Sequence, residues 1–226
     1  MPENNTFFQQ VMDRYAVHDP LSGVNPEFIA ALLRAFEENS FSAADFEPFP
    51  VELIVEYIQR THVFYLQKKL PEIEQSILLL SGLYTEHHPI LAVLHNFFHR
   101  YCEDLTTHIR AEETTFLPYI AILHRSVHAR SPYSEYILAR RQNSIAGFLA
   151  DHHDTEDELK DVREAIRLYD PPVTNASLYR VLLTQLETFE QDLCVHACIE
   201  DQVLIPKALQ LETSLDERIG KMAGWN

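Results

Sequence analysis

Two histidine–glutamate pairs with the same spacing are the residues best suited to do chemistry in this sequence. Glu112 follows His108 by four positions, and Glu200 follows His196 by four positions. In a helix, residues four apart lie about 40° apart around the axis and about 6 Å apart along it. The imidazole and the carboxylate of each pair can therefore reach the same metal ion.

The position of these pairs within their helices separates them from ordinary surface pairs, which a single His-x-x-x-Glu pattern usually represents. His196 and Glu200 continue an alternating four-three spacing of apolar residues, and so do His108 and Glu112. This spacing is typical of the stripe that a helix turns toward the core of a bundle. Both pairs are therefore predicted to be buried.

Single histidines occupy the corresponding stripes of two further predicted helices. His62 follows Ile58 by four positions, and His152 follows Phe148 by four, whereas His153 lies one step off that stripe. A buried unpaired carboxylate costs several kcal/mol, and an unsatisfied imidazole costs about 1–3 kcal/mol. A bound metal would offset this cost directly, so the sequence predicts these metal ligands: His62, His108, Glu112, His152, His196 and Glu200.

The mixture of imidazole and carboxylate donors indicates which metal to expect. Carboxylates from facing helices of a bundle can bridge two metals while histidines bind at the ends. Such a donor set suits iron or manganese better than calcium or a closed zinc–thiolate site. The sequence therefore predicts a dinuclear metal centre inside a helical bundle.

The remaining histidines have weaker support as ligands. At about 100° per residue, four of them lie on the opposite side of the second long helix from His108. His87 and His88 lie in the turn before that helix, where a ligand role and a capping role both stay open. The four histidines that face away are His95, His99, His124 and His128.

The three cysteines form no Cys-x-x-Cys redox motif. Cys194 and Cys198 flank His196, and Cys102 follows Tyr101. Small thiols at such positions are more often packed beside a core than reactive. We expect all three to be buried structural thiols.

The elements that must position these residues are long helices. The chain has only 5 glycines among 226 residues and no segment with convincing strand-like alternation. Pro71 is predicted to kink or split the first helix. The expected fold is all-α, an antiparallel four-helix bundle with helices near 51–80, 89–123, 143–169 and 176–211.

A small helical region is predicted to precede the bundle. Residues 1–45 contain two short helical patterns, near 7–17 and 26–38, and residues 46–50 read as a linker. The bundle is expected over residues 50–212, and residues 213–226 are expected to form a tail.

Composition limits the classes of partner. With 34 acidic and 18 basic residues the net charge is −16, which argues against binding nucleic acid or an anionic membrane. The odd number of cysteines argues against a secreted disulfide scaffold. The first ten residues lack the pattern of a signal peptide, and no apolar run approaches the roughly 20 residues of a membrane helix. We expect a cytoplasmic protein.

With these residues placed, the chain resembles the hemerythrin-like di-iron proteins of the repair of iron centres family, also called the RIC or ScdA type. The resemblance runs from about Pro50 to Leu209. It rests on four segments, at 52–62, 108–118, 151–163 and 192–208. It implies two bound iron ions, with four histidine ligands and with Glu112 and Glu200 as bridging carboxylates. The histidine ligands are His62, His108, His152 and His196.

The chain departs from the family pattern at three places. The family usually has another histidine before the second helix, where this chain has Tyr84, with His87 three residues further on. Tyr84, His87 or water can complete the site. Val63 stands where the family often has a second adjacent histidine. The cysteine pair of the family's small N-terminal domain is replaced by Pro20 and Leu21, so thiol chemistry is not expected there.

The resemblance implies repair of iron–sulfur clusters, or defence against nitric oxide and oxidative stress. The expected partners are iron, the diatomic ligands O₂ or NO, and damaged iron–sulfur proteins. The alternative is a non-enzymatic sensor or carrier of O₂, NO or iron, which catalytic turnover would distinguish. A third reading is a metal-free helical interaction module, in which Glu112 and Glu200 could be replaced without loss of stability.

Overall fold

A computed structural model describes residues 11, 13, 25–37, 41–83, 89–128, 133–151, 176–222 and 224, without the side chains of 89–92, 151 and 176. Every regular element in this part of the chain is helical, which confirms the all-α prediction. No helix in these ranges is long and apolar enough to cross a membrane.

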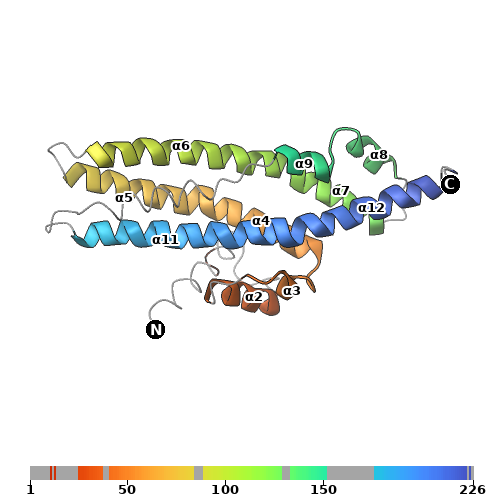
Figure 1. Ribbon diagram of the computed structural model, residues 1–226, viewed down its shortest axis with the longest axis horizontal. Coiled ribbons are helices and arrows are strands. Elements are labelled where there is room, and N and C mark those ends of the chain that lie inside the picture. Colours follow the sequence, from red (N-terminus) through yellow and green to blue (C-terminus); the bar gives the residue numbers. More distant parts are fainter. Residues whose placement is uncertain are drawn as a thin grey trace.

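In the described part of the chain, three long helical rods lie side by side, and the last of them in the sequence runs nearly the whole length of the molecule (Figure 1). Each rod consists of an α-helix, one π-helical turn and a second α-helix. The first rod is α4 (Val51–Phe64), η1 (Tyr65–Lys69) and α5 (Leu70–Leu83); the second is α6 (Pro89–Ala111), η2 (Glu112–Phe116) and α7 (Leu117–His128); the third is α11 (Ala176–Ile199), η4 (Glu200–Leu204) and α12 (Ile205–Met222).

Shorter helices complete the described structure. The third predicted bundle helix begins with α9 (Ile145–Asp151), which packs against α12. Its continuation, together with most of the predicted helix near 7–17, lies outside the described residues. The remaining helices are α2 (Pro26–Glu37), α3 (Ala43–Phe46) and α8 (Ser134–Arg140).

Each π-helical turn ends two residues before a proline. Pro71 lacks a backbone N–H, and in a regular α-helix its ring would collide with the carbonyl four residues earlier. The preceding residue, Leu70, instead donates its N–H to the Tyr65 carbonyl five residues back, and the helix continues through the proline. The same arrangement precedes Pro118 and Pro206. Pro71 was predicted to kink or split the helix. A π-helical turn accommodates it instead, and the rod continues.

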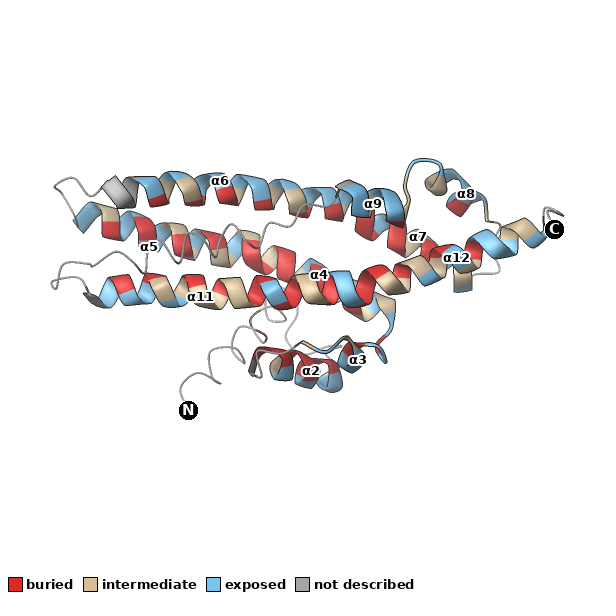
Figure 2. Ribbon diagram, in the orientation of Figure 1, coloured by how far each residue is buried: buried red, intermediate tan, exposed pale blue. Residues whose placement is uncertain are grey.

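Buried residues recur at intervals along the inner faces of the rods (Figure 2). One hydrophobic cluster joins α5, α6 and the first half of α11. A second joins α2, α4, α7 and α12. The residues around His196 connect the two clusters, since Leu193 belongs to the first and Ile199 to the second.

The N-terminal region is anchored to the bundle by aromatic packing. The Phe28 ring makes edge contacts with Phe46 at 5.7 Å, Phe49 at 5.0 Å and Tyr57 at 5.6 Å between centroids. Phe46 and Phe49 belong to the segment expected to be a linker, and both are buried. This segment therefore packs as part of the core.

The last rod extends further than the sequence pattern indicated. Residues 213–222, expected in a tail, continue α12 to Met222. Leu215 is fully buried in this extension, and Arg218 Nη1 donates to the Val127 carbonyl at 3.2 Å. The added turns are held by the end of α7, which the apolar spacing of the fourth helix alone did not reveal.

Replacing Phe28 by alanine tests the anchoring of the N-terminal region. Removing a buried phenylalanine ring leaves a cavity, so the free energy of unfolding should fall by about 3–5 kcal/mol. Chemical denaturation monitored by circular dichroism measures this change. Leu138→Ala is the matched control, because Leu138 is 63% exposed and its loss should change stability by less than about 0.5 kcal/mol.

Candidate metal centre

A buried carboxylate that contacts two imidazoles from different rods is at the centre of the site. Glu112 Oε2 lies 2.9 Å from His62 Nε2, and Glu112 Oε1 lies 2.7 Å from His108 Nε2. The side chains of His62 and Glu112 are 2% and 1% exposed, whereas that of His108 is 20% exposed. Glu112 therefore links the first rod to the second at a depth that water hardly reaches.

The third rod adds His196 to this group. One ligand atom each from His62, Glu112 and His196 lie within 4.8 Å of one another, and all three residues are buried. The rings of His62 and His196 are 5.2 Å apart between centroids. Three nitrogen and oxygen donors this close suit one transition-metal ion, for which ligand bonds are about 2.0–2.2 Å long.

Glu200 lies beside this group on the third rod. Its Oε2 is 3.8 Å from His196 Nε2, and its side chain is 3% exposed. The structure thus brings together, at one level of the bundle, five of the six residues that the sequence singled out: His62, His108, Glu112, His196 and Glu200. The sixth, His152, lies outside the described residues, as do Tyr84, His87 and His88.

The histidines expected to face away have other surroundings. The side chain of His99 is 59% exposed and lies 3.7 Å from Glu103. His124 Nε2 lies 2.8 Å from Glu52 Oε1, and its ring lies 4.2 Å from that of His128. Within the described ranges, none of these residues belongs to the buried group of His62, Glu112 and His196.

Glu113 is a site residue that the sequence reasoning missed. Its Oε1 lies 2.7 Å from His62 Nδ1, and its Oε2 accepts a hydrogen bond from Gln59 Nε2 at 3.2 Å. The hydrogen bond from His62 holds the pKa of Glu113 below its usual value, although partial burial opposes this. An ionised Glu113 keeps a proton on Nδ1 of His62, so that Nε2 is directed toward Glu112 and the site.

The protonation of His62 reflects the two carboxylates that flank it. Burial acts to lower the pKa of His62, but the hydrogen bonds and negative charges of Glu112 and Glu113 outweigh burial and raise it. Without a metal, the ring can hold a proton between the two carboxylates. A metal ion at Nε2 would take the place of that proton and supply the same positive charge.

The π-helical turns begin at or beside the predicted ligands. Glu112 is the first residue of η2 and Glu200 the first residue of η4, while η1 begins three residues after His62. Such turns often occur at functional sites. A signal for them was present in the sequence, because each turn begins six residues before a proline, at Pro71, Pro118 and Pro206.

Asp192 was also missed as a buried polar residue near the site. It is fully buried and lies one helical turn before His196 on the same stripe. The spacing was available in the sequence, since Asp192, His196 and Glu200 are successive positions four apart. The third rod therefore presents a buried acid on either side of its histidine.

The structure corrects the interpretation of Cys194. This residue is exposed, whereas Cys198 and Cys102 are partly buried. Residues two positions from His196 point about 200° away from it around the helix axis. Cys194, two positions before the inward-facing His196, is therefore directed outward.

Comparison with known proteins places this geometry in a family. The profile of the hemerythrin HHE cation binding domain matches residues 67–208, which include His108, Glu112, His196 and Glu200. The iron-sulfur cluster repair protein ScdA of Staphylococcus haemolyticus is 21% identical to this chain over 154 residues. That alignment covers 68% of this chain and 65% of the relative, so it spans slightly less than two thirds of the relative's length.

The role of Glu113 can be tested by replacing it with glutamine. Loss of the charge that orients His62 should weaken binding of Co²⁺, used here as a spectroscopic metal, by about 10- to 100-fold. Titration followed by visible absorption measures the affinity. Glu103→Gln is the matched control, because Glu103 lies on the same rod and pairs with the exposed His99. Equal Co²⁺ affinities in the two variants would contradict the positioning role.

The cysteines should differ strongly in their reactivity with iodoacetamide. Burial, with a smaller effect of the Glu74 charge, raises the pKa of the Cys102 thiol to about 12. Because the thiolate is the reactive form, at pH 8 Cys102 should react at least about 100-fold more slowly than the exposed Cys194. Peptide mass spectrometry after timed labelling measures both rates in one sample.

Proposed function

The chain belongs to the hemerythrin HHE family of cation-binding domains, and from this premise we propose that it is a non-haem iron protein that acts in the repair of iron–sulfur clusters. The observation that carries the proposal is the buried group of His62, Glu112 and His196, which joins three rods at one level. The name of the ScdA relative supplies the proposed process.

The donor set supports iron as the metal. The described site contains three imidazoles and two carboxylates and no thiolate, since Cys194 is exposed and Cys198 belongs to no His/Glu group. We propose a di-iron centre in which Glu112 and Glu200 are bridging ligands. The histidine ligands in this proposal are His62, His108, His196 and, from the segment outside the described residues, His152.

The protein's own residues prepare the site for a cation. Glu112 and Glu200 provide negative charge where their burial leaves little water to screen it. Glu113 fixes the His62 ring so that its Nε2 faces the site. The hydrophobic clusters on either side hold the rods at a constant separation. Iron bound there would supply redox chemistry and open positions for small ligands such as O₂ or NO.

The remaining parts of the proposal concern setting and partners. We propose that the protein acts in the cytoplasm under nitric oxide or oxidative stress, with damaged iron–sulfur proteins as partners. This part rests on the ScdA relative, whose length the chain covers to 65%. The net charge of −16 is compatible with attraction of iron cations and disfavours nucleic acid as a partner.

Metal loading provides the direct test. Under anaerobic conditions the chain should bind about two Fe²⁺ ions, as expected for a di-iron bundle site. Ligand binding to the folded state alone stabilises it by about 3–4 kcal/mol at 100–1,000 times the Kd, so the Tm should rise. The double variant Glu112→Gln/Glu200→Gln should lose both the bound iron and the Tm increase.

A matched control removes two exposed carboxylates instead. Glu135→Gln/Glu217→Gln makes the same change in charge at exposed positions and should bind iron as the unmodified chain does. Iron analysis and differential scanning calorimetry measure both properties. Iron content well below one per chain in the unmodified protein would refute the iron proposal.

Repair activity requires a separate assay. A [4Fe–4S] enzyme inactivated by NO should regain activity when incubated with the iron-loaded chain, but not with the Glu112→Gln/Glu200→Gln variant. Reversible binding of NO or O₂ with a spectral change and without reactivation would instead support the sensor or carrier alternative.

A further inference from the structure

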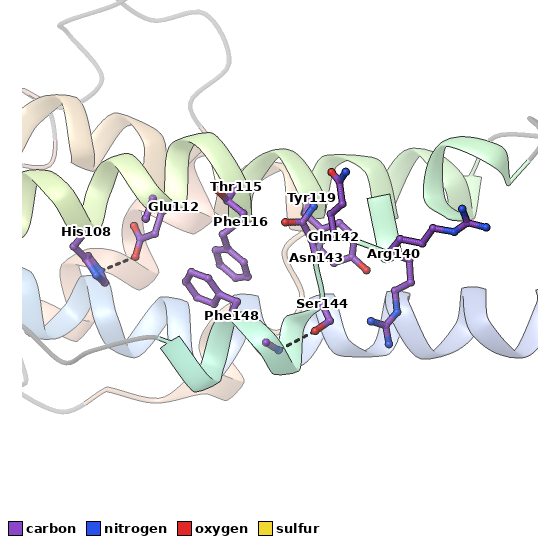
Figure 3. Close-up of a pocket in the computed structure, with 13 residues that line it drawn as sticks. His108, Glu112, Thr115, Phe116, Tyr119, Arg140, Gln142, Asn143, Ser144 and Phe148 are labelled. Atoms are coloured by element: carbon purple, nitrogen blue, oxygen red, sulfur yellow. Dashed lines mark hydrogen bonds and ion pairs between the residues drawn. The ribbon is translucent and has the colours of Figure 1, made fainter. Parts of the chain in front are cut away.

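A pocket of about 440 Å³ reaches the metal centre from one side of the bundle (Figure 3). His108 and Glu112 line its inner end, and the segment that joins α8 to α9 lines its outer end. His108 is also the most exposed of the five predicted ligands that lie in the described structure. The pocket therefore leads to the most accessible edge of the proposed centre.

The interior of the pocket changes in character along its length. Near the centre the wall is aromatic, where Phe116 and Phe148 stack with their ring centroids 3.8 Å apart and an interplanar angle of 4°. Beyond this pair the wall is polar, with side chains that can donate and accept hydrogen bonds (Figure 3). The polar residues are Tyr119, Gln142, Asn143 and Ser144.

A buried carboxylate network fixes the outer wall in place. Glu212 Oε1 accepts hydrogen bonds from the Tyr119 hydroxyl at 2.6 Å and from the Ile145 backbone N–H at 3.3 Å. Arg140 Nε lies 3.6 Å from the same oxygen. These contacts tie α7, α9 and α12 together, so the pocket is preorganised.

The outer end carries a positive charge that no acidic residue in the described structure pairs with. Arg140 faces the carboxylates of Glu212 and Asp216, each at 3.6 Å, and this environment raises its pKa although burial opposes the shift. The adjacent Arg141 is exposed and forms no ion pair with any residue in the described part of the chain. In a chain of net charge −16, Arg141 is therefore a localised positive charge at the rim of the pocket.

The volume of the pocket argues against a diatomic molecule as its main occupant. Sites for small organic ligands span about 300–1,000 Å³, and this pocket lies in that range. An occupant must combine negative charge for Arg141 with groups that hydrogen-bond to Gln142, Asn143 or Ser144. A small organic polycarboxylate has both, because its carboxylates pair with guanidinium and accept further hydrogen bonds.

We propose that this pocket binds a small organic polycarboxylate at its outer end, where Arg141 holds a carboxylate group, and that iron chelated by it then passes along the pocket to His108 and Glu112. The delivery step rests on the proposed iron centre, whereas the binding of the carboxylate does not. Ligand exchange alone moves the ion: iron–carboxylate bonds break as bonds to histidine and glutamate form, and no electron is transferred.

The first experiment measures binding of citrate to the metal-free protein by isothermal titration calorimetry. Arg141→Gln should weaken binding about tenfold, as expected from losing one charge-assisted contact. Arg125→Gln is the matched control, since it removes the same charge from an exposed arginine that pairs with Glu135 away from the pocket. No citrate binding, or equal binding by the two variants, would overturn the proposal.

The second experiment distinguishes a free carboxylate from one that carries iron. Initial rates of iron uptake are compared with ferrous citrate and with unchelated Fe²⁺ as the source. If the pocket receives the chelate, Arg141→Gln should slow uptake from ferrous citrate about tenfold and leave uptake of unchelated Fe²⁺ unchanged. If citrate binding depends on Arg141 but the unmodified chain and Arg141→Gln take up iron from ferrous citrate at equal rates, the pocket binds the free carboxylate and the delivery step is overturned.

The outcome of the citrate titration is independent of the proposed metal centre, whereas the uptake experiment requires that centre. The citrate titration uses metal-free protein, so a chain that binds no iron still gives a result for the pocket. Conversely, a chain that binds about two iron ions but shows no Arg141-dependent citrate binding keeps its metal centre and loses the pocket assignment.

Discussion

The burial of Glu112 is the constraint on which the rest of the structure depends. A carboxylate that is 1% exposed is stable only if positive charge and hydrogen-bond donors surround it. His62 and His108 provide them from two rods, and a ring nitrogen of His196, on the third rod, lies within 4.8 Å of atoms of His62 and Glu112. The rods must therefore meet at one depth. This requirement explains why the polar group lies where the two hydrophobic clusters join, with apolar packing on both sides.

The three π-helical turns allow each rod to contain a proline and still continue as a helix past the polar centre. Each turn accommodates a proline without ending its helix, and two of the three begin at the glutamates of the centre. A π-turn contains one residue more than the α-helical turn it replaces, so the residues after it are rotated relative to those before it. The stripe that carries the predicted ligands can then be followed by a second apolar stripe, which packs α7 against α12. In the second and third rods, the glutamate and the proline therefore belong to the same π-helical feature.

Much of the site could be predicted because, in a helix, the spacing of residues along the sequence determines which of them share the buried face. Stripes of apolar residues placed His62, Glu112 and His196 at the same level, and the structure has them there. Adjacent residues point about 100° apart, so a stripe that selects Glu112 assigns its neighbour Glu113 to the surface. The contact between Glu113 and His62 depends on how two rods are rotated against each other, which no single helix encodes. The same limit hid the extension of α12, whose burial comes from α7.

The exposure of the histidine side chains differs across the centre, so one side of the centre is more accessible than the other. The side chains of His62, His196 and His108 are 2%, 9% and 20% exposed, so access to the centre is easiest beside His108. The pocket opens at that edge, and its outer wall is the segment that Glu212 ties to α7 and α12. The acidic surface attracts cations in general, whereas Arg141 favours an anion at this one place. A chelated cation would suit both, because its organic end is negative and its metal would meet the histidine and glutamate proposed as ligands inside.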